Sequence, residues 1–238
     1  MQIDILAIVS HPDDAELSCA GTLMLAKKKG QTTGIVDLTL GELGTRGTPE
    51  IRAQEAQNAA RILELDVRES LDLGDGFFDQ SRESLEEVIR VIRRYRPKVV
   101  ITNAVSDRHP DHARGSELVS RACFLAGLEK IATTDSGEAQ SPWRPKEVFH
   151  VIQFRYMTPD FVVDIGEVFV RKMESIKAFR SQFYDPESKE SPTLISSKKF
   201  LDYVESRARE FGASIEVEFG EGYVVERPLK VDDILSHI

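Results

Sequence analysis

The feature that most constrains the fold is an alternation, over the first half of the chain, of short apolar runs with segments of helical length. Strand-like runs lie at residues 3–9, 34–40, 69–73 and 98–103. The segments between these runs carry apolar residues at helical spacing. Because parallel strands need long crossover connections, this alternation predicts an α/β fold with a mostly parallel sheet and helices on both of its faces.

Local signals mark the ends of the expected helices. A helix over residues 15–29 ends in three lysines and Gly30, which suit the C-terminus of a helix. The next helix begins at Pro49, whose fixed φ suits a first helical turn. Two more are expected at residues 85–95, where Pro97 follows, and at residues 113–127.

The second half of the chain is less regular. We expect one domain, with a Rossmann-like core over residues 1–127 and an appended C-terminal α+β section over residues 128–238. Within that section the pattern predicts a surface loop at residues 133–145 and strands at 148–154 and 161–165. It then predicts helices at 168–183 and 199–211 and a final strand pair at 215–225.

Composition excludes several classes of function. The formal net charge is -9 and the lysines and arginines are scattered, which argues against nucleic acid as a partner. No apolar run approaches the ~18 residues of a membrane span, and the first residues lack a signal-peptide pattern, so we expect a cytoplasmic protein without a membrane partner. Cys19 and Cys123 belong to no metal-binding or redox motif, and we expect both to be reduced and buried.

Two polar motifs follow two of the expected strands. Residues 10–16 read Ser-His-Pro-Asp-Asp-Ala-Glu after the first strand, and residues 107–112 read Asp-Arg-His-Pro-Asp-His after the fourth. Ligands of open α/β sheets bind outside the carboxyl ends of the strands, so both motifs fall where a site is expected. The chain has two other histidines, His150 and His237, which we expect to be ordinary core or surface residues.

The two motifs together predict a metal site. A catalytic zinc ion needs three protein ligands and one position left for water, and His11, Asp14 and His112 are suited to supply them. Hard Mg²⁺ or Ca²⁺ would favour more carboxylates, so Zn²⁺ is preferred, with Fe²⁺ or Co²⁺ as other transition metals that such a site accepts.

The remaining polar residues of the motifs suit catalytic roles. Asp13 is placed to act as general base toward the attacking water. His109 would stabilise an oxyanion or protonate the leaving amine, and Asp111 would orient His109 and favour its charged form. The alternative is that these aspartates and histidines only cap helices.

The motifs HPDDAE at residues 11–16 and HPDH at residues 109–112 resemble the PIG-L/LmbE-like family of zinc-dependent N-acetylglucosaminyl deacetylases. Ser10 stands where Ala is more usual in that family, a change that touches none of the expected roles. Four further stretches resemble the bacillithiol-biosynthesis branch: GELGTRGT at 41–48 with Arg52, DGFF at 75–78, WRP at 143–145 and SQFYDP at 181–186.

This resemblance implies an activity. The branch removes acetate from N-acetylglucosaminyl-malate to give glucosaminyl-malate in bacillithiol biosynthesis, and the same resemblance implies the metal ligands, base and acid named above. It also implies a homo-oligomer, with a hexamer suspected, and a small-molecule N-acetylglucosaminyl conjugate as the partner.

Four residues are candidates for substrate binding. Arg52 corresponds to a family arginine that contacts sugar hydroxyls, and Asp75 follows the third strand, where a carboxylate can accept from a hydroxyl pair. Glu42 is a further candidate in the same crevice. Malate carries two carboxylates, and Arg108 is the guanidinium expected to bind them.

Three other functions remain open from the sequence. One is a deacetylase of another N-acetylglucosaminide. A binuclear metallophosphoesterase would need about twice the ligand set. A non-catalytic sugar-binding module would hold a structural zinc, which usually has four protein ligands.

Overall fold

A seven-stranded sheet forms the centre of the computed structural model, which describes residues 1–233. The strand order is β3-β2-β1-β4-β7-β9-β8, and only β9 runs antiparallel to its neighbours. The predicted α/β fold with a mostly parallel sheet is therefore confirmed. The strands are β1 (Ile5–Val9), β2 (Thr33–Asp37), β3 (Val67–Ser70), β4 (Val99–Thr102), β7 (Glu147–Val151), β8 (Phe161–Asp164) and β9 (Gly220–Val225).

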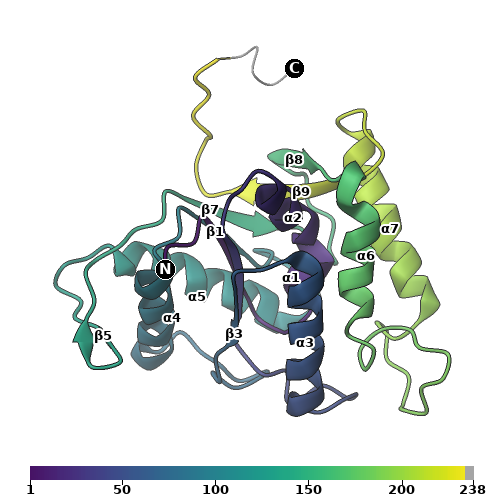
Figure 1. The fold of residues 1–238 in the computed structure, drawn as a ribbon, viewed down its shortest axis with the longest axis horizontal. Helices are drawn as coiled ribbons and strands as arrows, with labels where there is room; N and C mark the ends of the chain where they lie inside the picture. The colour runs from purple at the N-terminus through teal and green to yellow at the C-terminus, as the bar shows by residue number, and fades with distance from the viewer. Residues whose placement is uncertain (234–238) are drawn as a thin grey trace.

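Helices cover both faces of the sheet (Figure 1). One face packs against α4 and α5, and the other against α1, α2, α3, α6 and α7. The helices are α1 (Asp14–Ser18), α2 (Ala20–Lys28), α3 (Pro49–Leu63), α4 (Arg82–Tyr95), α5 (Pro110–Ala126), α6 (Phe169–Lys177) and α7 (Lys198–Ala213), with a 3₁₀ turn at Gly166–Val168.

Strand β1 is apolar throughout because both faces of the sheet are covered at this strand. Leu6 and Ile8 belong to the core cluster that includes α4 and α5, whereas Ala7 and Val9 belong to the cluster on the opposite face. Successive side chains of a strand point to opposite faces, so a strand covered on both sides must be apolar at every position.

The expected helix over residues 15–29 is broken at Cys19, which separates α1 from α2. A distant carboxylate caps the second of the two helices. Glu221 of β9 accepts hydrogen bonds from the backbone N–H groups of Gly21 and Thr22, at 2.9 and 2.8 Å. These are free N–H groups of the first turn of α2, and local sequence gives no sign that a residue two hundred positions away satisfies them.

The expected strand pair over residues 215–225 was wrong, because this segment forms the single strand β9 after a turn. Two glycines allow β9 to approach the end of α7. A Cβ on Gly212 would lie 2.7 Å from the backbone nitrogen of Phe219, and one on Gly220 would lie 2.9 Å from the nitrogen of Gly212. Gly212 and Gly220 therefore mark a close contact between two backbone segments.

Smaller differences concern three other segments. The expected surface loop at 133–145 contains a short hairpin of β5 (Thr134–Asp135) and β6 (Glu138–Ala139). The helix expected at 168–183 ends at Lys177. The third strand is β3, which begins at Val67 rather than at residue 69.

Both cysteines are free and buried, as expected. Within residues 1–233, no helix combines the length and the apolarity needed to cross a bilayer. The polar motifs follow β1 and β4, two neighbouring strands of the sheet.

Candidate active site

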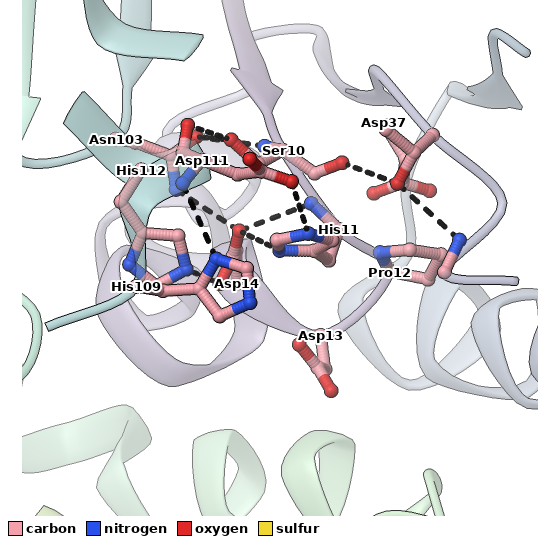
Figure 2. A network of polar contacts seen from close by, with 12 residues as sticks. Ser10, His11, Pro12, Asp13, Asp14, Asp37, Asn103, His109, Asp111 and His112 are labelled. Carbon is pink, nitrogen blue, oxygen red and sulfur yellow. Dashed lines mark hydrogen bonds and ion pairs between the residues drawn. The ribbon is translucent and has the colours of Figure 1, made fainter. Parts of the chain in front are cut away.

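The two polar motifs meet because β1 and β4 are parallel neighbours in the sheet. Ile8 pairs with Thr102, so the segments that follow the two strands leave the same edge side by side. The first motif passes directly into α1, and the second into α5, whose N-cap residue is His109. The imidazoles of His11, His109 and His112 consequently cluster with the carboxylate of Asp14 (Figure 2).

Asp14 lies between the two histidines expected to share a metal with it. Its Oδ1 is 3.1 Å from Nε2 of His112, and its Oδ2 is 3.4 Å from Nδ1 of His11. Ligand atoms of a tetrahedral zinc site with bonds of about 2.0–2.1 Å stand roughly 3.3 Å apart, so both separations suit a shared ion. Ligand atoms of His11, His109 and His112 also lie within 4.8 Å of one another, as do those of His11, Asp75 and Asp111. The donor set therefore fits a transition-metal cation.

Asp107 holds His112 in place, a role that the sequence reading missed. Its Oδ2 lies 2.5 Å from Nδ1 of His112, and its Oδ1 accepts from the backbone N–H groups of Phe154 and Arg155. With the ring proton on Nδ1, the lone pair of Nε2 is directed toward Asp14. A carboxylate behind a metal-binding histidine fixes its orientation in this way.

A buried amide network positions Asp14. Its carboxylate accepts from Nδ2 of Asn103 and Nε2 of Gln153, both at 2.9 Å. Asn103 is held in turn by Ser10, whose backbone N–H donates to its Oδ1 at 2.7 Å and whose hydroxyl lies 3.0 Å away. Ser10 is thus one contact removed from Asp14, an expected ligand.

Three carboxylates surround His11. Its Nε2 lies 3.0 Å from Asp75 and 3.4 Å from Asp111, while Asp14 faces Nδ1. Burial favours the neutral ring, but the hydrogen bonds to Asp111, Asp14 and Asp75 outweigh it and hold the pKa of His11 well above its usual range. The structure places Asp75 behind His11, with its other oxygen bound to the N–H of Leu43, rather than free to take a sugar hydroxyl.

Asp111 does not orient His109 as expected. Its carboxylate accepts from the N–H of Gly76 and from Arg114, both at 2.8 Å, whereas its backbone N–H donates to Nδ1 of His109 at 3.3 Å. The reason is geometric, because His109 caps α5 and a cap accepts from a backbone N–H of the first turn.

The pKa of His109 is shifted in the direction opposite to the expected one. Burial, together with the positive charges on His11 and His112, lowers the pKa of His109 below its usual value. Because Nδ1 accepts the hydrogen bond from Asp111, the ring proton of neutral His109 is on Nε2. His109 thus offers one N–H donor to the cavity that it lines.

Asp13 is separate from the imidazole network. Its side chain points away from the dashed contacts of Asp14 in Figure 2 and accepts from Nη2 of Arg52 at 3.1 Å. Burial raises the pKa of Asp13 to about 7, against the opposing charge of Arg52. Its backbone is in the positive-φ region, at 119°, a strained conformation for aspartate that is found mainly at functional sites.

The other three residues expected to contact the substrate differ in whether their side chains already have partners within the protein. Arg52 is buried, and besides Asp13 it donates to the carbonyl groups of Pro12 and Gly41. Glu42 accepts from the N–H groups of Asp75 and Leu40, so it braces the loop rather than facing a substrate. Arg108 is exposed at the cavity, with its guanidinium 5.2 Å from the ring centre of Phe154.

A buried ion cluster anchors the helix that carries Asp14. Arg68 of β3 donates to Glu16 at 2.6 Å and to Asp37, at the end of β2, at 3.0 Å. All three side chains are almost completely buried. One guanidinium cannot neutralise two carboxylates, and burial raises the pKa of Asp37 to about 6 although Arg68 opposes that rise.

Among the described histidines, His150 is apart from the site. His150 of β7 is buried, with Nδ1 2.8 Å from the hydroxyl of Ser116 and Nε2 3.1 Å from Glu226, so its ring is satisfied in the core as expected. His237 lies outside the described residues.

Comparison with known proteins identifies the class of enzyme. The family model described as PIG-L, GlcNAc-PI de-N-acetylase, matches residues 6–123. The uncharacterized deacetylase YaiS of Escherichia coli is 30% identical over 166 residues, 65% of this chain and 84% of YaiS. The conserved protein TT1542 from Thermus thermophilus is 34% identical, and its crystal structure matches 98% of this chain and 99% of its own with a TM-score of 0.86. The chain belongs to the PIG-L family of deacetylases.

Other relatives have named reactions. The diacetylchitobiose deacetylase of Thermococcus kodakarensis is 28% identical over 75% of this chain and 70% of its own. The probable N-acetyl-alpha-D-glucosaminyl L-malate deacetylase 2 of Bacillus subtilis is 28% identical over 76% and 84%. The 4-oxalmesaconate hydratase of Pseudomonas putida is 26% identical over 76% and 74%. These relatives and the site make this chain an enzyme of the deacetylase class.

We predict that Asp107→Asn weakens metal binding. An amide can present a donor rather than an acceptor to Nδ1 of His112, so the ring loses its fixed orientation. The dissociation constant for Zn²⁺, measured by chelator competition, should rise about 10–100-fold. The exposed Asp72→Asn is the matched control and should bind as the wild type does. Equal affinities for Asp107→Asn and the wild type would contradict this role.

We predict a pH-dependent effect of Asp37→Asn on stability. The pKa of Asp37 is about 6 in the folded state against an ordinary value of 3.8, so the folded protein holds an extra proton between these pH values. This group therefore makes the free energy of unfolding fall as pH rises from about 4 to about 6.

The variant lacks that titration. Relative to the wild type, its free energy of unfolding should increase with pH across this window, by at most about 1.4 kcal/mol per pH unit. Urea denaturation at several pH values measures it, with the exposed Asp202→Asn as control. A constant difference between variant and wild type across the window would refute the shifted pKa.

Proposed function

We propose that this enzyme is a zinc-dependent deacetylase that hydrolyses N-acetylglucosaminyl-malate to glucosaminyl-malate and acetate. The observation that carries the proposal is the convergence of His11, Asp14 and His112 in one cavity with a separate, buried Asp13. The malate conjugate is supported by the resemblance of several stretches of the chain to the bacillithiol branch and by the malate deacetylase relative.

His11, Asp14 and His112 would hold the metal. Bound there, zinc would polarise the acetyl carbonyl group and lower the pKa of a water molecule. Two imidazoles and one carboxylate suit Zn²⁺ and also Fe²⁺ or Co²⁺, and the preference for zinc is part of the proposal.

Asp13 takes the proton of the attacking water. A general base works best when its pKa is near the working pH, and burial brings the pKa of Asp13 to about 7. Arg52 fixes the direction of the Asp13 carboxylate through its hydrogen bond at 3.1 Å. The same carboxyl group can then deliver the proton to the amine as the C–N bond breaks.

His109 stabilises the negative charge that develops on the acetyl oxygen. Its neutral ring carries the proton on Nε2. This N–H group can donate a hydrogen bond to the oxygen and keep its proton. A fixed donor of this kind lowers the barrier to acyl transfer because the charge on the oxygen grows in the transition state.

Arg108 is the proposed partner of the malate carboxylates. It is exposed at the cavity, and in the described part of the chain no carboxylate forms an ion pair with it, whereas Arg52 is bound to Asp13. A free guanidinium at the mouth of the cavity matches a dicarboxylate group.

Two other reactions are tested by the same preparation. A binuclear phosphoesterase would need a second ion, for which His11, Asp75 and Asp111 offer ligand atoms within 4.8 Å of one another. The proposed deacetylase needs one ion, so two tightly bound ions per chain would favour the phosphoesterase. Hydration of an unsaturated acid, as named for the Pseudomonas relative, would give no acetate.

Removal of the metal should abolish the reaction. Protein treated with a chelator is expected to release no acetate from N-acetylglucosaminyl-malate, and addition of Zn²⁺ should restore the release. Free N-acetylglucosamine in a parallel assay tests the malate assignment, because equal rates for the two compounds would remove it. Full activity in metal-free protein would sink the proposal as a whole.

Two substitutions should separate the base from the ligands. Asp13→Asn should lower kcat on the order of 10²-fold or more and keep the bound metal, because it removes the proton acceptor alone. His112→Ala should lose the metal itself. Metal content and kcat are measured on the same samples, and the reverse pattern would exchange the two roles.

A further inference from the structure

The cavity at the active site continues beyond the metal ligands into the second half of the chain. Its volume is about 450 Å³, within the range of small-molecule sites. One face of α7 forms a wall of this extension, with Phe200, Val204, Ala208 and Phe211 at helical spacing. We call the part of the cavity lined by these four residues, Leu17 and Ile195 the apolar compartment.

This face of α7 both lines the cavity and packs against the core, since Phe200 and Val204 belong to the cluster that contains Phe179. Phe200, Val204, Ala208 and Phe211 are each 9% exposed or less, so each contributes a small part of its apolar surface to the cavity wall. Apolar surface that faces a cavity is stabilised when an apolar ligand group replaces the water there.

The charged side chains next to this compartment already have partners within the protein. Lys172 and Glu221 line its inner end, 2.6 Å apart and almost completely buried, and they neutralise each other. Arg207, on the flank of the same helix face, donates to the carbonyl groups of Gln153 and Phe154. A carboxylate would therefore lose its hydration in the compartment without gaining an unpaired cation.

The malate carboxylates are therefore not stabilised in this compartment. Arg108, whose guanidinium forms no ion pair with any described carboxylate, is not part of it. We infer that the enzyme has a second substrate class, namely N-acetylglucosaminides whose aglycone is an uncharged apolar group such as an aromatic ring, and that the compartment binds this aglycone. The reaction is the same hydrolysis of the acetamide, with water as the co-reactant and acetate as the product. This inference rests on the proposed deacetylase function.

The compartment also has a distinct origin in the chain. The metal ligands and the base all lie within residues 6–123, the span of the family model, whereas α7 lies outside it. The chemistry and the choice of aglycone are therefore carried by different segments.

The test compares phenyl and methyl N-acetyl-α-glucosaminides as substrates of the zinc-loaded enzyme. The two probes differ only in the aglycone, so the ratio of their kcat/KM values measures how much the compartment favours the phenyl group. We expect the phenyl compound to be preferred at least about tenfold, since hydrophobic pockets discriminate by roughly 10–200-fold for a single methylene group.

Substitutions on α7 locate the effect. Val204→Phe fills the compartment and should bring the phenyl-to-methyl ratio close to one. Ser206→Phe places the same side chain on the exposed side of α7 and should leave the ratio unchanged. Ala208→Val narrows the compartment with a smaller group and should also lower the ratio, which guards against misfolding of Val204→Phe. Thermal unfolding of each variant accompanies the kinetics.

The outcomes separate this inference from the proposed function. If the wild type deacetylates the malate and methyl compounds but shows no phenyl preference, or if Val204→Phe and Ala208→Val keep that preference, the inference is overturned and the deacetylase function stands. If folded, zinc-loaded protein deacetylates none of the three compounds, the proposed function fails and the inference falls with it.

Discussion

The parallel pairing of β1 with β4 is the constraint on which the site depends. The proposed metal ligands come from positions about a hundred residues apart, and the register of these two strands brings them together. The amide of Asn103, directly after β4, then binds both Ser10 and Asp14 after β1. The sheet and this side-chain bridge fix the same geometry, so the ligands are preorganised by the fold rather than by the metal alone.

Negative charge is concentrated where a cation fits. Asp14, Asp75, Asp107 and Asp111 all contact His11 or His112, and the raised pKa values of these two histidines reflect that surplus. Asp13 lies outside this group and contacts Arg52 instead. The two adjacent aspartates therefore have opposite environments, and the pKa of Asp14 is held well below its usual value while that of Asp13 is raised. Such divergence suits the proposed roles of Asp14 as a metal ligand and Asp13 as a base.

Much of this arrangement could be predicted from the sequence, because periodicity and motif spacing carry local information. The parallel strands and the positions of His11, Asp14 and His112 at their ends follow from such patterns. Asp107, Asn103 and Gln153 could not be assigned, because their roles depend on which distant side chain each meets. Asp111 was misread for a related reason, since spacing indicated proximity to His109 without showing that the backbone N–H makes the contact.

The bond between Glu221 and the start of α2 has a consequence for how the protein folds. It joins positions 200 residues apart, and contacts of that separation carry a large loop-closure cost. A nascent chain that has emerged only through α5 already contains every proposed metal ligand. It still lacks Gln153, which binds Asp14, and the strand that satisfies the N–H groups of α2. The chemical groups of the site are thus synthesised early, and their framework is completed only by the last strand.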